Sequence, residues 1–333
     1  MIGRRTAAGL LAAGLFAAVS TACAAPVPPP SAQRLDVTRS GAQAEAALAT
    51  LRQVDDHPLF EMTDRGPAPR LVPGSPAATP PAGRSGYACT VFYAGGLMGR
   101  NFDWDHSPAL VLRSYPTDGY ASISLVDLSY LGIRSASDVS DPARRPELLR
   151  AAALPFDGVN EHGLAVGMAA DEAGRTEVRP GRPVVGSLAV IRLALDKART
   201  VAEAVAIFES YTVDFSGGPP LHYLIADAAG SAVVVEYVDG DLKVLPREKP
   251  WHLMTNFPLA VTDDEGRQAD RRYRTGSAAL EAAGGRLDEA AALALLSRVR
   301  QGHTQWSLVY DLAAVSAAVV TGQKYDRVHR LAL

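Results

Sequence analysis

Cys89 is the residue of this 333-residue chain whose type and position are best suited to covalent chemistry. The chain has two cysteines, and the other, Cys23, ends an apolar segment at the N-terminus. Cys89 lies between a Pro/Gly-rich stretch, 71–86, and the first strand-like apolar run, Thr90–Ala94. Cleavage after Ala88 would make Cys89 a chain terminus, whose α-amine titrates near about pH 8 and can take the proton of its own thiol. The alternative is a small buried cysteine that only packs.

Arg100 and Asp103 have the chemistry to assist such a nucleophile. The Gly-Gly pair at 95–96 predicts a tight turn that folds Leu97–Phe102 back along the preceding run and brings Arg100 and its neighbours near Cys89. A nearby guanidinium favours a thiolate by charge, and a carboxylate can hold an amine in place. An ordinary Arg–Asp surface pair on a hairpin is the alternative for these two residues.

The elements that must position these residues form an α+β pattern, in which sheets are covered by helices. An Asp-Gly pair at 239–240 predicts a second tight hairpin. The expected strands are Thr90–Ala94, Leu97–Phe102, Ala109–Leu112, Ala121–Leu125, Leu164–Met168, Tyr223–Ala226, Ala232–Val238, His252–Thr255, Trp306–Tyr310 and Ser316–Val320. The expected helices are Ser187–Ala198, Val201–Ser210, Asp270–Ala283 and Leu287–Val299.

Residues 1–24 predict an export signal. Arg4 and Arg5 precede 13 apolar or small residues, 7–19, which end close to Cys23. Thirteen helical residues rise about 20 Å, short of the roughly 30 Å hydrocarbon core of a membrane. The Ala22-Cys23 pair fits either a lipid anchor on Cys23 or ordinary cleavage. We therefore expect an extracytoplasmic protein, periplasmic or secreted, either free or anchored as a lipoprotein.

Three further segments follow the export signal. Residues 25–41 begin with a proline-rich run that predicts an extended tether. Residues 42–88 predict a leader that opens with a short amphipathic helix, Ala42–Val54, and ends in an irregular cleavage loop around Pro80 and Pro81. Residues 89–333 form the expected catalytic domain.

Charge and composition exclude several classes of partner. The chain has 33 basic and 36 acidic residues, and removing residues 1–24, with two arginines and no acid, leaves a net charge of −5. No basic run offers a footprint for nucleic acid. His162, His222 and His303 lack metal-ligand spacing, so we expect no metal and no other cofactor. Glu236 is expected on a solvent-facing side of its strand.

The motifs resemble a known family. Cys89-Thr90 followed by the Gly-Arg-Asn-Phe-Asp-Trp run at 99–104 is similar to the cysteine-type N-terminal-nucleophile hydrolases of the choloylglycine hydrolase and penicillin V acylase group, the linear amide C–N hydrolases. Acid ceramidase and the acyl-coenzyme A:6-aminopenicillanic acid acyltransferases are relatives of this group. Further matching segments lie, in order, at 157–164, 222–227, 254–258 and 306–311. The resemblance covers about residues 89–331.

The resemblance implies a four-layer αββα sandwich, autocatalytic cleavage before Cys89, and hydrolysis of a linear amide in an N-acylated small molecule. Cys89 would be the nucleophile, with its freed amine as base. Arg100 would lie beside the thiolate, Asp103 would position the amine, and Asn256 would donate to the oxyanion. A turn asparagine is the alternative for Asn256.

Three more positions follow from the resemblance. A second active-site arginine would be Arg272, with Arg274 as the next choice. The Met-Ala-Ala run at 168–170 departs from the family, because relatives often have a polar side chain there that assists the oxyanion. The leader segment 56–63 resembles leaders that stay bound after cleavage. Packing of Leu59, Phe60 and Met62 on the larger chain would then give a small/large heterodimer.

Two other classes compete with this interpretation. One is a catalytically silent, exported binding lipoprotein on the same scaffold, favoured by the missing polar side chain at 168–170. The other is a papain-like cysteine protease, but the residues around Cys89 lack the glycine- and tryptophan-bearing surroundings of that nucleophile.

Overall fold

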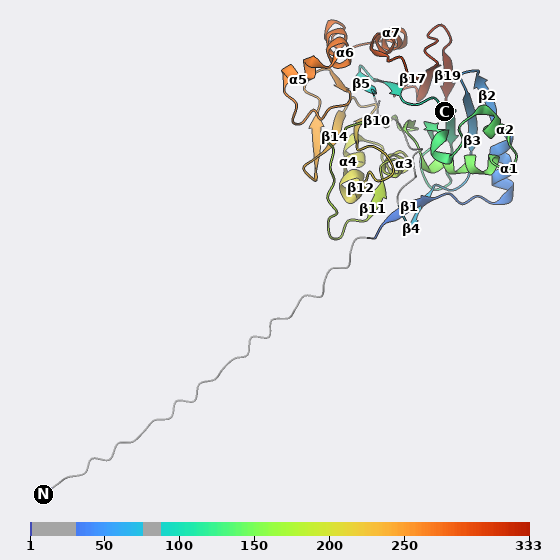
Figure 1. The fold of residues 1–333 in the computed structure, drawn as a ribbon, viewed down its shortest axis with the longest axis horizontal. Coiled ribbons are helices and arrows are strands. Elements are labelled where there is room, and N and C mark those ends of the chain that lie inside the picture. Colours follow the sequence, from blue (N-terminus) through green and yellow to red (C-terminus); the bar gives the residue numbers. More distant parts are fainter. Residues whose placement is uncertain (2–30, 76–87) are drawn as a thin grey trace.

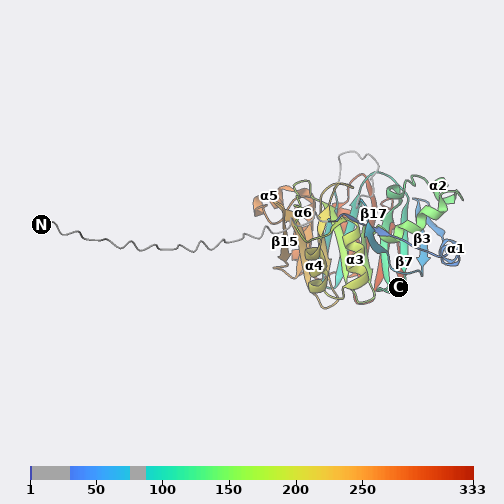
Figure 2. The same ribbon diagram turned by 90° about the horizontal axis from the view of Figure 1, so that it is seen from below.

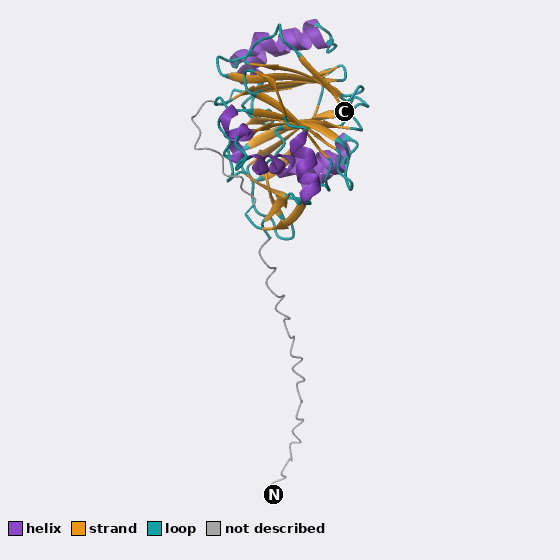
Figure 3. Cartoon of the chain, turned by 90° about the vertical axis from the view of Figure 1, so that its right-hand side faces the viewer, coloured by secondary structure: helices purple, strands orange, loops and turns teal. Residues whose placement is uncertain are grey.

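Two large β-sheets pack face to face, and helices cover both outer faces (Figure 3). The computed structural model describes Met1 and residues 31–75 and 88–333. The predicted α+β class and the αββα sandwich are confirmed. Three expected segments lie outside the described residues. They are the remainder of the export signal with Cys23, the first part of the tether, and the cleavage loop at Pro80 and Pro81.

The larger sheet has nine strands within the described residues, in the order β15-β14-β13-β10-β9-β8-β7-β3-β2. All neighbours pair antiparallel except β3 and β7, which are parallel. The strands are β2 (Arg52–Asp55), β3 (Leu59–Asp64), β7 (Ala109–Ser114), β8 (Ser122–Asp127), β9 (Asp157–Asn160), β10 (Ala165–Ala170), β13 (Leu221–Ala226), β14 (Ala232–Val238) and β15 (Asp241–Pro246).

The smaller sheet has six antiparallel strands in the described ranges, in the order β16-β5-β6-β17-β18-β19. Its strands are β5 (Thr90–Ala94), β6 (Leu97–Asp103), β16 (Trp251–Met254), β17 (Thr304–Asp311), β18 (Ser316–Thr321) and β19 (His329–Ala332). Two short pairs complete the strands: β1 (Gln33–Asp36) with β4 (Arg70–Pro73), and β11 (Val184–Gly186) with β12 (Thr212–Asp214).

Helices form the outer layers (Figure 1). The α3 and α4 helices lie side by side on the nine-stranded sheet, as Figure 2 shows, whereas α6 and α7 cover the six-stranded sheet. The helices are α1 (Gly41–Ala49), α2 (Ala136–Ser140), α3 (Ala189–Lys197), α4 (Val201–Ser210), α5 (Asp264–Ala269), α6 (Arg271–Ala282) and α7 (Glu289–Val299), with 3-10 turns η1 (Leu128–Leu131) and η2 (Arg145–Ala153). No helix in the described part of the chain is long and apolar enough to cross a membrane.

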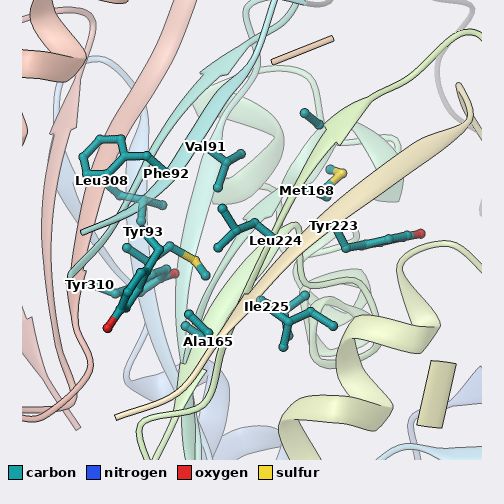
Figure 4. Packing of buried hydrophobic residues seen from close by; sticks show 14 of the residues in the cluster. Val91, Phe92, Tyr93, Ala165, Met168, Tyr223, Leu224, Ile225, Leu308 and Tyr310 are labelled. Carbon is teal, nitrogen blue, oxygen red and sulfur yellow. The ribbon is translucent and has the colours of Figure 1, made fainter. Parts of the chain in front are cut away.

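The core lies between the two sheets. Inward-facing residues of β5, such as Val91, pack against Leu224 of β13 (Figure 4) and lie over Gly167 of β10. All five residues of β5 and all six residues of β10 are buried, because the opposite faces of their sheets are covered by helices. Such strands are apolar throughout their length. The nucleophile candidate therefore precedes one of the most deeply buried strands of the molecule.

The two predicted hairpins are confirmed. β5 pairs with β6 across Gly95 and Gly96, which have φ of 59° and 90°. β14 pairs with β15 across Asp239 and Gly240, with φ of 51° and 86°. Positive φ at both central residues is the geometry of a tight two-residue hairpin turn. The first of these turns fixes how β6 returns past Cys89.

The leader is part of the fold. β3 is inserted between β2 and β7, and Leu59, Phe60 and Met62 are buried in it, as the resemblance implied. The helix expected over Ala42–Val54 is shorter, because the chain turns at Thr50 and continues as β2. β1 lies in the range assigned to the tether, where it pairs with β4 at the start of the segment expected to be irregular.

Candidate active site

Cys89 immediately precedes β5 and is 4% exposed. Opposite it, the backbone N–H of Asp103, the last residue of β6, donates to the sulfur. Burial raises the pKa of the Cys89 thiol, and the positive charge of Arg100 opposes this shift only in part. In the uncleaved chain, the sulfur is therefore a protonated thiol next to the two residues that the hairpin was expected to bring to it.

Asp103 has one carboxylate oxygen in use and one free. Thr304 Oγ1 donates to Oδ1, whereas Oδ2 is buried and has no hydrogen-bond partner among the described residues. Burial raises the pKa of Asp103 to about 6, although the hydrogen bond from Thr304 and the charge of Arg272 lower it. A buried hydrogen-bond acceptor without a donor destabilises the fold. This oxygen is therefore suited to accept a hydrogen bond from a cationic group that forms later.

Arg100 is completely buried in an ion pair with Asp157 of β9. Its Nη1 also donates to the Phe156 carbonyl oxygen at 2.9 Å, and the Tyr310 hydroxyl donates to Asp157 Oδ1 at 2.6 Å. Arg100 thus belongs to a buried network, and the alternative of a surface pair with Asp103 is wrong. Asp157 and Tyr310 lie in segments that carried the family resemblance, but their contact with Arg100 depends on pairing between distant strands.

Arg272, the second residue of α6, contacts the nucleophile residue directly. Its Nη1 donates to the Cys89 carbonyl oxygen at 2.5 Å and to Asn256 Oδ1 at 2.8 Å, and Nη2 pairs with Asp270 at 3.0 Å. Asp270 also caps the helix by accepting from the Tyr273 backbone N–H. The structure therefore places Arg272 at Cys89, whereas the second choice, Arg274, is exposed on the outer side of α6.

Asn256 follows β16 and lies at the end of β10. Its Nδ2 donates to the Ala170 carbonyl oxygen at 2.7 Å, and its Oδ1 accepts from Arg272. The Met-Ala-Ala run at 168–170 therefore approaches the site through backbone and apolar side chains. Arg272 joins Asn256 to Cys89 through two hydrogen bonds, so all five predicted site residues converge on one place.

A narrow apolar cavity opens at Cys89. Its volume is about 30 Å³, enough for about two water molecules. The lining residues are Cys89, Phe102, Trp104, Tyr130, Phe156, Met168, Ala170, Ser187, Leu188, Gly217, Gly218, Pro219 and Leu221. A second cavity of about 220 Å³ shares Tyr130, Ser187, Leu188 and Gly217 with it and extends to tether residues 34–37 and to Arg150. An apolar inner pocket with a more polar outer part suits a small molecule that carries an apolar group.

The structure corrects the expectation for Glu236. Glu236 is completely buried, so the prediction that it faces solvent is wrong. Helices and the segment after β16 cover both faces of β14, and the alternation of exposure expected for a half-exposed strand is absent.

His222 is a buried histidine, and both of its ring nitrogens have hydrogen-bond partners. In residues 31–75 and 88–333, no three His, Cys, Asp or Glu side chains converge as a metal site would require.

Comparisons with known proteins agree with this geometry. Residues 155–275 match the family model of acyl-coenzyme A:6-aminopenicillanic acid acyltransferase. A mutant of conjugated bile acid hydrolase from Clostridium perfringens superposes with a TM-score of 0.53 at 15% identity, covering 74% of this chain and 92% of that one. Penicillin V acylase from Agrobacterium tumefaciens gives a TM-score of 0.49 at 19% identity, covering 71% and 83%. No curated protein matches the sequence significantly.

The two-sheet sandwich covered by helices is the fold that this chain shares with the conjugated bile acid hydrolase mutant. The family match lies entirely within the part of the chain that follows Cys89. Together they confirm the resemblance predicted from the motifs, to the cysteine-type hydrolases of the choloylglycine hydrolase and penicillin V acylase group.

Proposed function

We propose that this chain hydrolyses a linear amide in an N-acylated small molecule, with Cys89 as an N-terminal nucleophile. The observation that carries the proposal is the convergence of Asp103, Arg272 and an apolar cavity on Cys89. The charge of Arg100 acts on the Cys89 thiol, and Asn256 is bound by the same Arg272 that contacts Cys89. No cofactor takes part in the proposed reaction.

Cleavage of the Ala88–Cys89 peptide bond supplies the base. The new α-amine takes the proton of the thiol, and the resulting ammonium accounts for the free Asp103 Oδ2 as its acceptor. The charges of Arg100 and Arg272 favour the thiolate in this pair. The proposed cleavage thus changes Cys89 from a protonated thiol to a thiolate with its own proton carrier.

The thiolate then attacks the amide carbonyl. A carbon–sulfur bond forms, and the carbonyl electron pair moves to the oxygen, where Asn256 Nδ2 and a backbone N–H donate hydrogen bonds. The α-ammonium protonates the nitrogen as the carbon–nitrogen bond breaks, and the amine leaves. Water hydrolyses the thioester, which releases the acid and restores the thiol.

The leader stays bound in the proposed mature enzyme. β3 pairs along its whole length with β7 and buries Leu59, Phe60 and Met62. A strand that is paired on both sides and buries three side chains in the core has no reason to leave when the bond before Cys89 is cut. We therefore propose a small/large heterodimer. Export through residues 1–24, with or without a lipid on Cys23, remains part of the proposal.

The second candidate is a catalytically silent binding lipoprotein. The absence of a polar side chain at Met168 and Ala170, both at the cavity, favours it. An assay separates the two candidates, because binding alone leaves the ligand intact.

The test compares wild-type protein with Cys89→Ala and Cys89→Ser. We expect the intact mass of wild-type protein to show a break before Cys89, and both variants to stay uncleaved and inactive. Purified processed protein is incubated with bile-salt conjugates, phenoxyacyl penicillins, N-acyl homoserine lactones, N-acylethanolamines and acylated amino acids, and products are read by mass spectrometry. Full activity in a chain still joined across Ala88–Cys89 would contradict the proposal.

A further inference from the structure

A buried ionic pair lies next to the site but outside the direct contacts of the nucleophile. His222 of β13 and Glu236 of β14 lie opposite each other on neighbouring strands, in continuation of the pairing of Tyr223 with Val235. Both side chains are completely buried. Their separation, from His222 Nδ1 to Glu236 Oε1, is 3.1 Å. Buried charges of this kind are costly, so what they contact matters.

The hydrogen bonds of the pair determine its protonation. His222 Nε2 lies 2.8 Å from the Thr255 carbonyl oxygen, which only accepts, so Nε2 carries a proton. Glu236 accepts from the backbone N–H groups of Leu259 at 2.7 Å and Ala260 at 2.9 Å. Burial raises the pKa of Glu236, but the hydrogen bond from His222 and these two N–H groups together bring that pKa below its usual value. The hydrogen bonds therefore place a proton on His222 Nε2 and a carboxylate at Glu236.

The pair holds both ends of one short segment. His222 binds the carbonyl of Thr255, at the start, and Glu236 binds the amides of Leu259 and Ala260, at the end. Asn256 lies inside this segment, immediately after Thr255. Its side chain makes contacts with Ala170 and Arg272, but the path of its backbone is set by the two anchors.

We propose that the His222–Glu236 pair is a positioning device that holds Asn256 where its amide can donate to the oxyanion. This inference rests on the proposed amidase function. The two side chains do not touch the reacting atoms in this arrangement. They act through the backbone of 255–260, which they tie to β13 and β14 of the nine-stranded sheet.

The test uses Glu236→Gln and His222→Gln, which keep approximate shape and remove one charge each, with the double variant beside them. Activity is measured per cleaved chain, counted by intact mass. We expect kcat to fall about 10- to 100-fold in each single variant with KM changed less than about threefold, a smaller loss than the 10²–10³ typical of deleting an oxyanion donor. The double variant, which is neutral and can rebuild a hydrogen-bonded chain, should recover part of this loss.

His252→Gln is the matched control. His252 is on β16, three residues before Thr255, and its Nε2 also meets a backbone carbonyl, that of Leu245, at 3.1 Å. Among the described residues, its ring hydrogen-bonds to Leu245 and to the backbone N–H of Leu253, and to no residue of 255–260. We expect its kcat to stay within about twofold of wild type.

Hydrogen exchange gives a readout that does not depend on activity. The amides of Leu259 and Ala260 should exchange at least about tenfold faster in Glu236→Gln, while β13 and β14 stay protected. Unchanged exchange of the Leu259 and Ala260 amides in Glu236→Gln would overturn the inference. General unfolding of both single variants, with kcat and KM both impaired, would overturn it as well. If wild-type protein hydrolyses no amide, the proposed function fails, whereas the exchange result still decides whether the pair holds the segment.

Discussion

At the scale of single residues, the uncleaved site holds the proposed nucleophile, Cys89, in an unfavourable state. Burial raises the pKa of the Cys89 thiol, and Asp103 has a carboxylate oxygen without a donor among the described residues. An ammonium group at the nitrogen of Cys89 would change both features, because it would favour the thiolate and donate to the free oxygen of Asp103. Cleavage of the preceding peptide bond would supply it.

Asp103→Asn tests the cost of this arrangement in an uncleaved Cys89→Ala background. The pKa of Asp103 is about 6, above its ordinary value of 3.8, so the native state binds more protons than the unfolded state between these values. The stability that Asp103 contributes therefore falls as the pH rises from about 4 to about 6. Over this pH range, we expect the unfolding free energy of the Asn variant to rise by up to about 3 kcal/mol relative to that of the protein with Asp103. Urea titrations at several pH values measure it, and a difference independent of pH would refute it.

Asp157→Asn tests the buried partner of Arg100. Removing one charge of a buried pair leaves the other uncompensated, and the loss in unfolding free energy should be about 3–5 kcal/mol. Tyr310→Phe removes only the hydroxyl that donates to Asp157 and should cost about 2 kcal/mol. Denaturant unfolding of both variants measures the two losses in unfolding free energy and shows which is larger. A larger loss in Tyr310→Phe would show that the ion pair is less important than the hydroxyl.

At the scale of elements, the leader contributes the last two strands at one edge of the nine-stranded sheet, β3 and β2. β3 lies between β2 and β7, and its pairing with β7 is the one parallel contact in the nine-stranded sheet. Strands of this kind are held by neighbours on both sides and by a covered face. The leader and the rest of the nine-stranded sheet therefore stabilise each other.

Met62→Ala tests this contribution. Met62 is 1% exposed, and truncating a buried methionine costs about 2–5 kcal/mol. We expect this loss in the unfolding free energy of the uncleaved protein. After cleavage, the small chain should also separate at a lower urea concentration. The control is Val261→Ala, which is 64% exposed and should stay within about 0.5 kcal/mol. Equal stability of the two variants would contradict a structural role for the leader.

At the scale of the whole molecule, charges join the leader to the C-terminal strands. Asp55 and Asp56 of the leader face Lys324 and Arg327, and His329 Nε2 lies 2.8 Å from Asp55 Oδ2. The Asp55 side chain is 1% exposed, whereas that of Asp56 is 72% exposed. These contacts connect β2 of the nine-stranded sheet to β19 of the six-stranded sheet and to the turn before it.

Asp55→Asn and Asp56→Asn form a matched pair of neighbours. In the cleaved protein, we expect Asp55→Asn to weaken retention of the small chain by about 30-fold or more, because a buried partner of several cations is lost. Asp56→Asn should weaken it less than about fivefold, as exposed pairs contribute little. Size-exclusion chromatography across a dilution series measures retention. Equal effects would mean that exposure does not govern this contact.

The local features of this fold could be predicted from sequence. All ten predicted strands and all four predicted helices of the catalytic domain occur, with ends shifted by at most two residues. Turn residues such as Gly95-Gly96 and runs of apolar residues act over a few positions, so they are legible without the rest of the chain. The same holds for Cys89, whose position at a loop–strand junction identified it.

The tertiary structure decided what depends on distant pairing. Strand β3 went unrecognised because its parallel partner β7 follows about 50 residues later. The choice of Arg272 over Arg274 depended on which face of α6 meets Cys89. Glu236 was misplaced because β14 is covered on both faces, which removes the alternation that marks a solvent side. Local patterns determine elements, but only the register between elements determines which charges share a buried space.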